Sequence, residues 1–343
     1  MNTPRQPQNP IAQLSELRPE SFQPHPVHGA ESDWSNTNCY LDVWVEVLNS
    51  LGLDPIPALA SAFSAEFVGD QWEFLKVRSE DLELLYGIRF GEYDTWKPLR
   101  EHLVTQLQAG NLAIVEVDAY YLPDTAGVSY HQQHSKTSIT PIKLDLRAAE
   151  LIYFHNGGLY QLANEDFEHT IGAAAETGFV PRPYLDLIRL DGLRQLQAAD
   201  FQRAARTVLR AHLARRERST QSDPMGLLVE YVQSQQETVA ELGLEHFHQF
   251  SFATTRQAGL TAMFAAELAR WFARTEKSAA GQQLLAEAAN AFSECSGSAK
   301  KLQFQLARVA AGRHPDLQAS GSTMQRSWQH GMRLVQQWDA LDA

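Results

Sequence analysis

Cys39 and its neighbours are the residues whose types and spacing best suit nucleophilic chemistry. The cysteine ends a polar stretch, Asn36-Thr37-Asn38, and an apolar periodic segment from Leu41 to Leu48 follows it. This pattern predicts a thiol at or near a helix N-terminus, where free backbone N–H groups and the helix dipole favour the thiolate. A lone cysteine before an apolar segment is also typical of a small buried side chain, so catalysis requires partners elsewhere in the chain.

Two histidines, His131 and His134, come just before a strand-like segment in the middle of the chain. Histidine titrates near neutrality and therefore suits a general base that takes the proton of a thiol. His134 lies closer to the predicted strand and is the preferred base, with His131 as the alternative. A metal site on the two histidines is a weaker interpretation, because no cysteine pair accompanies them.

A third group has to orient the imidazole by accepting a hydrogen bond from its other nitrogen. Asn156 follows the next predicted strand and is the preferred orienting residue, with His155 and Asp145 as alternatives. Asn156 also precedes Gly157 and Gly158, and Asn-Gly is equally typical of a tight hairpin turn.

Further candidates would bind the oxyanion or the substrate. The backbone N–H of Cys39 and the side-chain amide of Asn36 or Asn38 are the predicted oxyanion donors. Asp118 follows an apolar strand and precedes Tyr120, and both are candidates for substrate binding, Asp118 through an amine. A carboxylate that only caps the turn at the strand end is the simpler interpretation of Asp118.

The composition is that of a globular protein, with 343 residues, 44% hydrophobic and 20% charged, and the length suggests two domains. The net charge of -12 argues against nucleic acid or an anionic membrane as a partner. The two cysteines, Cys39 and Cys295, lie in different predicted domains and form no disulfide framework. Since no apolar run approaches a membrane span and no secretory signal is evident, a cytoplasmic location is predicted.

The order of the predicted elements indicates an α+β fold followed by helices. In the first half we expect helices at 39–51, 55–68, 79–87 and 96–109, and strands at 72–77, 112–118, 137–145, 151–155 and 159–162. In the second half we expect helices at 193–218, 225–242, 257–275, 279–293, 298–311 and 322–341. The predicted organisation is an extended segment at 1–30, an α+β domain with an antiparallel sheet at 31–190 and a helical bundle at 191–343.

Several of these motifs together resemble the N-terminal domain of butirosin-type aminoacyl transferases, which is similar to papain-like peptidases that process bacteriocins. The motifs are Asn38-Cys39-Tyr40, Val117-Asp118-Ala119-Tyr120-Tyr121-Leu122-Pro123, His134 and Asn156-Gly157-Gly158. The resemblance covers roughly residues 33–168. The whole chain also resembles a bacterial family known only as a domain of unknown function, whose members tend to sit beside carrier proteins and aminoacyl:carrier-protein ligases.

The resemblance implies a papain-like N-terminal domain that transfers acyl groups. Cys39 would take an aminoacyl group from the phosphopantetheine thioester of a carrier protein and pass it to an amine or hydroxyl acceptor, with His134 as base. No bound cofactor and no metal ion are expected. The relatives often carry an aspartate as the third residue, where this chain offers Asn156.

Two other functions are compatible with the same residues. A hydrolase (peptidase, amidase or thioesterase) would use Cys39 and His134 with water as the acceptor. A non-catalytic helical adaptor would keep Cys39 in its core. The arginines Arg215, Arg216 and Arg218 could dock an acidic carrier protein, although such a run is more typical of a solvated helix end.

Overall fold

A computed structural model describes residues 10–29 and 33–342. In it the chain forms two structural units. Among the described residues, the N-terminal unit comprises 10–29, 39–55 and 77–201, and the helical unit comprises 33–38, 56–76 and 202–342. The short segments 33–38 and 56–76, which we expected in the α+β domain, therefore pack with the helices.

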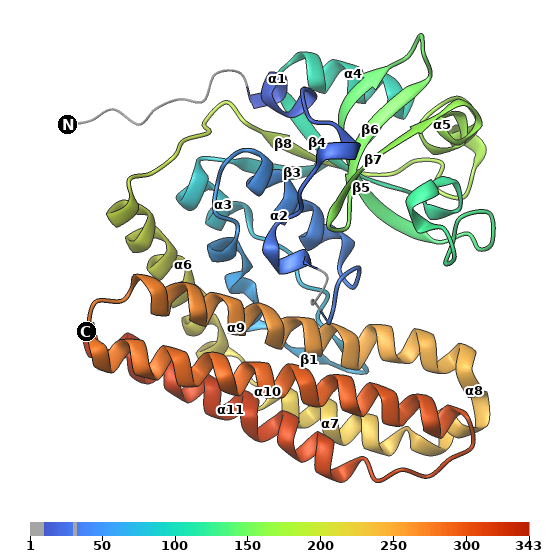
Figure 1. The fold of residues 1–343 in the computed structure, drawn as a ribbon. Coiled ribbons are helices and arrows are strands. Elements are labelled where there is room, and N and C mark those ends of the chain that lie inside the picture. Colours follow the sequence, from blue (N-terminus) through green and yellow to red (C-terminus); the bar gives the residue numbers. More distant parts are fainter. Residues whose placement is uncertain (1–9, 30–32, 343) are drawn as a thin grey trace. The chain divides into compact units, whose positions relative to one another are not determined.

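A six-stranded sheet forms the centre of the N-terminal unit (Figure 1). Its strands are β3 (Arg89–Tyr93), β4 (Asn111–Asp118), β5 (Lys136–Asp145), β6 (Glu150–His155), β7 (Gly158–Ala163) and β8 (Leu185–Arg189). The spatial order is β3-β8-β4-β5-β6-β7, and every neighbouring pair is antiparallel. The predicted α+β class with an antiparallel sheet is thereby confirmed. Strands β3 and β8 were not predicted from the sequence.

One face of the sheet is covered by α4 (Leu99–Gln108) and α5 (Asn164–Thr170). Leu103 of α4 and Phe167 of α5 pack there against strand residues such as Val115 and Tyr153 in one buried apolar cluster. The α4 face is therefore a closed hydrophobic core, held together by burial of apolar surface.

The opposite face is covered by α2 (Cys39–Ser50), which packs on β5 and β6. Tyr40 at its start hydrogen-bonds Asp186 of β8, and Trp44 contacts Phe90 of β3 at 5.1 Å between ring centroids. Residues Tyr40 to Leu48 are all buried, including Asp42 and Glu46. The helix is thus enclosed on all sides, and its two acidic side chains need buried partners.

His28 is the partner of both acids. Its Nδ1 lies 2.5 Å from Glu46 and its Nε2 lies 3.1 Å from Asp42, and all three side chains are buried. Burial by itself lowers the pKa of His28, but the hydrogen bonds and charges of Asp42 and Glu46 outweigh it and raise the pKa to about 9. One imidazolium therefore compensates two carboxylates and attaches the N-terminal segment to α2.

The N-terminal segment is less extended than the sequence suggested. Its described part contains α1 (Pro10–Ser15) and the single 3-10 turns η1 (Pro19–Ser21) and η2 (Pro26–His28). Residues 1–9 of the predicted segment 1–30 lie outside the described residues. Prolines at the first positions of all three elements set φ for a helical turn and need no N–H partner.

Two other elements differ from expectation. The segment predicted as a helix at 55–68 is the buried 3-10 helix η3 (Ile56–Ser64), followed by β1 (Phe67–Val68). The strand expected at 72–77 shrinks to β2 (Gln71–Trp72), which pairs with β1. The helix predicted at 79–87 is α3 (Ser79–Tyr86), which ends at Gly87 in the left-handed conformation as expected.

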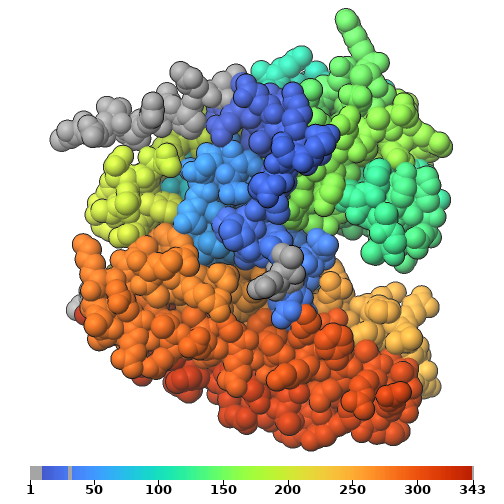
Figure 2. Space-filling model, viewed as in Figure 1, coloured from blue at the N-terminus to red at the C-terminus, as the bar shows by residue number. Residues whose placement is uncertain are grey.

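The helical unit is built from long helices. They are α6 (Ala198–Arg218), α7 (Pro224–Ser234), α8 (Gln236–Ser251), α9 (Gln257–Thr275), α10 (Ala279–Ala310) and α11 (Gln318–Asp339), with a π-helical turn η7 (Phe252–Arg256) before α9 and a 3-10 turn η8 (Ala340–Asp342) at the end. Figure 2 shows this unit, coloured orange to red, as closely packed atoms, and α10 packs against both α9 and α11. The helices predicted at 279–293 and 298–311 are one continuous helix, α10. The small residues Ser296 and Ser298, near the predicted break, are helical and buried.

Helix α8 is interrupted at Gly243, which has φ 75° and ψ -158°. Leu242 and Leu244 on either side of the break are both about half exposed. A residue with a side chain would be strained at this backbone angle, so glycine permits the break.

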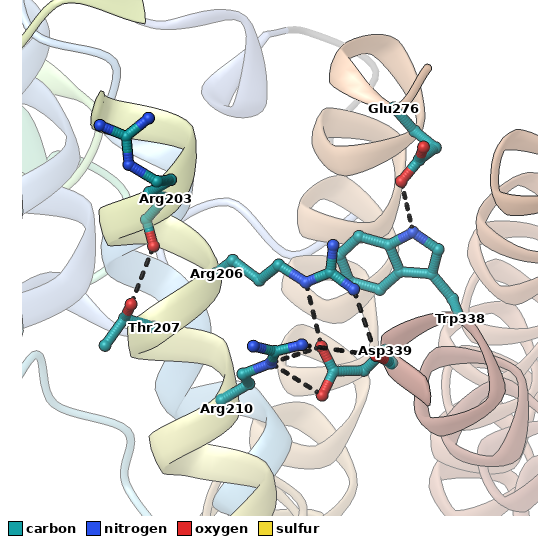
Figure 3. Close-up of polar contacts among 7 residues, drawn as sticks. All are labelled: Arg203, Arg206, Thr207, Arg210, Glu276, Trp338 and Asp339. Atoms are coloured by element: carbon teal, nitrogen blue, oxygen red, sulfur yellow. Dashed lines mark hydrogen bonds and ion pairs between the residues drawn. The ribbon is translucent and has the colours of Figure 1, made fainter. Parts of the chain in front are cut away.

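A polar cluster ties the end of α11 to α6 and α9 (Figure 3). The guanidinium groups of Arg206 and Arg210 both bind Asp339, with nitrogen–oxygen distances of 3.1 and 2.8 Å. Arg206 also lies over the Trp338 ring at 4.4 Å, and the Trp338 indole donates to Glu276 at 2.8 Å. The C-terminal turn of the unit is held by charge and stacking together.

The segment 33–38 is anchored in the core of the helical unit. The Trp34 indole donates to Ser296 at 2.7 Å, and the Ser296 hydroxyl donates to the carbonyl of Gly259. Any β-carbon at Gly259 would collide with the Trp34 ring. Among the described helices, none combines the length and apolar character that crossing a membrane requires.

We expect His28→Ala to lower the free energy of unfolding by about 3–5 kcal/mol, because it leaves two buried carboxylates without a cation. Since the pKa of His28 is raised to about 9, its contribution is full below the unfolded value near 6.5 and is lost as the pH rises through 9. Urea unfolding of both proteins at pH 6 and 9.5 measures this. The difference between them should shrink at high pH, and a difference independent of pH would contradict the assignment; the exposed His131→Ala is the control.

Candidate active site

Four strand ends meet at one end of the sheet. Strand β4 ends at Asp118, β5 begins at Lys136, β6 ends at His155 and β7 begins at Gly158. Because these strands are antiparallel neighbours, the loops between them carry their side chains to the same place. Most of the predicted site residues lie on these loops and strand ends.

His134 and Asp118 form an oriented pair there. His134 Nδ1 lies 2.6 Å from one Asp118 oxygen, while the other oxygen accepts from the backbone N–H groups of Tyr120 and Ser135 at 3.0 and 3.3 Å. Asp118 is buried and the His134 side chain is 51% exposed. Nε2 of His134 has no hydrogen-bond partner among the described residues, so this nitrogen remains available at the surface.

Aromatic rings fix the plane of the His134 imidazole. Tyr120 stacks on it with ring centroids 4.3 Å apart, and Phe179 lies 5.7 Å away. Carboxylate and stacked ring together restrict the imidazole to one orientation. His131, the alternative base, lies 3.6 Å from Asp166 and stacks on both Tyr130 and Tyr120.

His155 belongs to a second, enclosed pair. Its Nδ1 lies 2.5 Å from Asp124 and its Nε2 lies 2.8 Å from the Thr137 hydroxyl. Tyr153 donates to the same carboxylate, and burial, then the charge of Asp124, raises the pKa of this phenol. Both nitrogens of His155 are occupied and the ring is buried, so the pair has the character of a structural network.

The preferred orienting residue, Asn156, lies beside a different histidine. Its side-chain amide is 3.3 Å from His155, and its φ of 47° places it in the hairpin turn before Gly157. Asp145 lies at the other end of β5, where it accepts from the backbone N–H groups of Arg147 and Ala148, which lower its pKa. The structure gives His134 the carboxylate of Asp118, the residue that we had expected to bind substrate.

Cys39 is the first residue of α2 and its side chain is partly exposed. Among the described residues it has no hydrogen-bond or ion-pair partner. The neighbouring Tyr40 is held by Asp186 of β8. On the same side of the helix, one turn later, Asp42 binds His28, whose ring lies so close to Gly157 that a β-carbon there would sit 2.7 Å from it.

These contacts bracket the first turn of α2. One lies on β8 and the other at the β6–β7 turn, and the ends of β4 and β5 lie between them in the sheet order. Residues directly opposite in an antiparallel pair point to the same face. Asp186 is opposite Ile114, so alternate residues of β4 including Asp118 share the α2 face, whereas His155 is opposite Ile139 of the α4-face core.

The two side chains predicted to bind the oxyanion, those of Asn38 and Asn36, lie in different surroundings. Asn38 is buried and donates its amide to the carbonyl of Leu75 at 2.9 Å within the helical unit. Asn36 is exposed and has a φ of 60°. The backbone N–H of Cys39, at the start of the helix, thus remains the oxyanion donor that needs no side-chain rearrangement.

The second cysteine and the arginine run carry no comparable chemistry. Cys295 is fully buried in α10, and burial, helped by Glu294, raises the pKa of its thiol. Arg216 donates to the carbonyl of Gln221, and burial lowers the pKa of its guanidinium. The described residues contain no group of three or more histidine, cysteine, aspartate or glutamate side chains arranged to hold a metal ion.

Two partners that shape this region were not predicted from the sequence. Asp124 was not assigned, although it follows Pro123 in the same motif as Asp118. His28 was also missed; its signal was the pair Asp42 and Glu46, spaced by four residues inside an apolar helix. Two acids on one face of a buried helix predict a cationic partner.

Two family models match almost the whole of this fold. The DUF1839 N-terminal domain matches residues 23–190, and the DUF1839 C-terminal domain matches residues 198–337. The chain belongs to the DUF1839 family. No curated protein matches this DUF1839 chain. The names of the two domains carry no activity, so the resemblance to butirosin-type transferases stays a prediction.

We expect iodoacetamide to label Cys39 in the native protein and Cys295 only after unfolding. Cys39 is partly exposed at a helix start, whereas the Cys295 thiol is enclosed and its pKa is raised. Peptide mass mapping after a short exposure at neutral pH measures both sites, with Cys295→Ala as a control that keeps the fast adduct. Equal slow labelling of both thiols would show that Cys39 is not activated.

Proposed function

We propose that this DUF1839 protein is a cysteine-dependent acyltransferase with a papain-like N-terminal unit. The observation that carries the proposal is the Asp118–His134 pair. Asp118 lies on the sheet face covered by α2, and in the sheet order its strand β4 lies between β8 and the β6–β7 turn, which the first turn of α2 contacts through Tyr40 and through Asp42 with His28. A thiol nucleophile requires an oriented imidazole within reach, and here a helix that begins with a cysteine covers the sheet face that carries the carboxylate partner of His134.

The first half-reaction forms an acyl-enzyme. His134 Nε2 takes the proton of Cys39, and the thiolate attacks the carbonyl carbon of a thioester. The backbone N–H of Cys39 stabilises the oxyanion at the helix start. As the tetrahedral intermediate collapses, the carbon–sulfur bond of the donor breaks and the donor thiol takes the proton from His134.

The second half-reaction transfers the acyl group. An amine or hydroxyl acceptor attacks the Cys39 thioester while His134 takes its proton; the carbon–sulfur bond to Cys39 then breaks, and the leaving sulfur takes that proton from His134. Both oxygens of Asp118 are occupied, so in this scheme Asp118 orients His134 and does not bind a substrate amine. The thioester exchange of the first half-reaction is nearly isoenergetic, so there the protein has mainly to position groups and stabilise charge.

The proposed donor is the phosphopantetheine thioester of an acyl or aminoacyl carrier protein in the cytoplasm, and no bound cofactor is invoked. The half-exposed side chain of His134 supports a donor that arrives at the surface. A hydrolase would use the same residues with water as acceptor, and an adaptor would use none of them.

Intact-mass spectrometry tests the acyl-enzyme directly. We expect wild-type protein mixed with an aminoacyl phosphopantetheine thioester to gain the mass of the acyl group, and Cys39→Ala to gain none. His134→Gln should slow formation by about 10²–10⁴-fold, the usual contribution of a general base. The neighbouring His131→Gln, bound to Asp166 rather than Asp118, is the matched control and should keep the wild-type rate.

Three outcomes separate the functions. A lasting adduct that is discharged by added amines supports transfer, and an adduct that clears as fast without an acceptor indicates a hydrolase. An unmodified wild-type protein across several acyl groups would contradict catalysis by Cys39. If His131→Gln and His134→Gln slow the reaction equally, the base has been assigned wrongly.

A further inference from the structure

A cavity of about 310 Å³ lies in the N-terminal unit between the start of α4 and the segment 172–183 that leads into β8. Trp96, Lys97 and Leu99 line one side, and Glu176 and Arg182 line the other. The volume is in the range of small-ligand sites. The candidate active site does not use this cavity.

The cavity has a surplus of positive charge. Neither Lys97 nor Arg182 has a carboxylate partner among the described residues. Lys97 Nζ donates to the Thr105 hydroxyl at 3.0 Å and lies 5.5 Å from the centre of the Trp96 ring. Glu176, the acid of the lining, is neutralised by Arg100 at 3.2 Å. In a chain of net charge -12, such a surplus indicates a site for an anion.

The backbone at this site is held in place by His102. Its Nε2 accepts from the N–H groups of Trp96 and Lys97 at 3.2 and 3.3 Å. Burial and then the charge of Lys97 lower the pKa of His102, which keeps the ring a neutral acceptor. The N-cap of α4 is Pro98, which makes no side-chain capping bond, so the positive end of the helix adds to the two cations.

The same segment connects the cavity with the candidate base. Phe179 lies 5.7 Å from His134, and the next residues, Val180 to Pro183, line the cavity. Arg182 follows Phe179 by three residues, so their Cα atoms are at most about 11 Å apart. An anion held by Arg182 would thus lie close enough to the imidazole for one short linear molecule to reach both.

We propose that this cavity binds the phosphate of the phosphopantetheine donor, an inference that rests on the proposed function. Lys97, Arg182 and the first amides of α4 bind the phosphate, and the exposed Trp96 ring packs on the apolar part of the arm. The arm then runs past Phe179 and presents its thioester to His134. The cavity thereby distinguishes a phosphorylated donor from pantetheine alone.

Calorimetry on full-length Cys39→Ala protein tests the inference without catalysis. We expect 4′-phosphopantetheine to bind at least about tenfold more tightly than pantetheine, because charge-assisted contacts are lost with the phosphate. The pair Lys97→Gln/Arg182→Gln should abolish this preference. The pair Lys143→Gln/Arg147→Gln removes the same charge from exposed positions at the other end of the sheet and should preserve it.

Equal affinity for the two compounds, or an equal loss in both double variants, would overturn the inference. Binding of inorganic phosphate with no gain from the pantetheine arm would also overturn it, because the site would then serve another anion. These results are independent of acyl-enzyme formation. An acyl-enzyme formed equally well from both donors would leave the proposed function intact and remove only the phosphate site, whereas preferential binding without an acyl-enzyme would do the reverse.

Discussion

The architecture of the N-terminal unit depends on how two carboxylates are buried inside one helix. Helix α2 is enclosed from Tyr40 to Leu48, and Asp42 and Glu46 lie within that enclosed stretch. Isolated charges would not remain there, because transfer from water is too costly. His28 supplies the compensating proton, packs against Gly157 and so ties three separate parts of the chain together: the N-terminal segment, the helix and the β6–β7 turn.

That constraint sets the position of the cysteine. Because Asp42 follows Cys39 by nearly one turn, anything that fixes Asp42 also fixes the start of the helix. The sheet then decides which groups can share its surroundings, since alternate residues of a strand point to opposite faces. Asp118 shares the α2 face, and His155 points into the α4-face core, although both lie at strand ends.

Local patterns in the sequence were sufficient for much of this organisation. The polar-to-apolar change at Cys39 predicted the start of α2 at the residue where it begins, and the Gly157-Gly158 pair predicted the β6–β7 hairpin. Strands β3 and β8 were missed because their sequences show no clear alternation, and their pairing joins segments far apart in the chain. The long α10 was divided in two because Ser296 and Ser298 look like a break in the sequence. Both are in fact buried and helical, and Ser296 donates to the Gly259 carbonyl of α9.

The partners of individual side chains were harder to predict, because they depend on register. Asn156 was a reasonable choice for orienting His134, since both lie near strand ends. The loop after β4 instead brings His134 back to Asp118, sixteen residues earlier in the chain. No periodicity in the sequence predicts the hydrogen bond between them. Charge was more informative than position here: a buried carboxylate at Asp118 required a partner, and a nearby histidine was available.

The interruption of α8 at Gly243 marks a place where the chain can accept inserted residues. A residue inserted within α9 would rotate everything beyond it by about 100° and turn its buried side chains away from the core. At Gly243 the backbone already leaves the helix, and among the described residues outside its own helix backbone and chain neighbours no heavy atom lies within 4 Å of the position that a β-carbon would take. Extra residues can be accommodated at this point as a wider loop, with the helices on both sides keeping their own rotation.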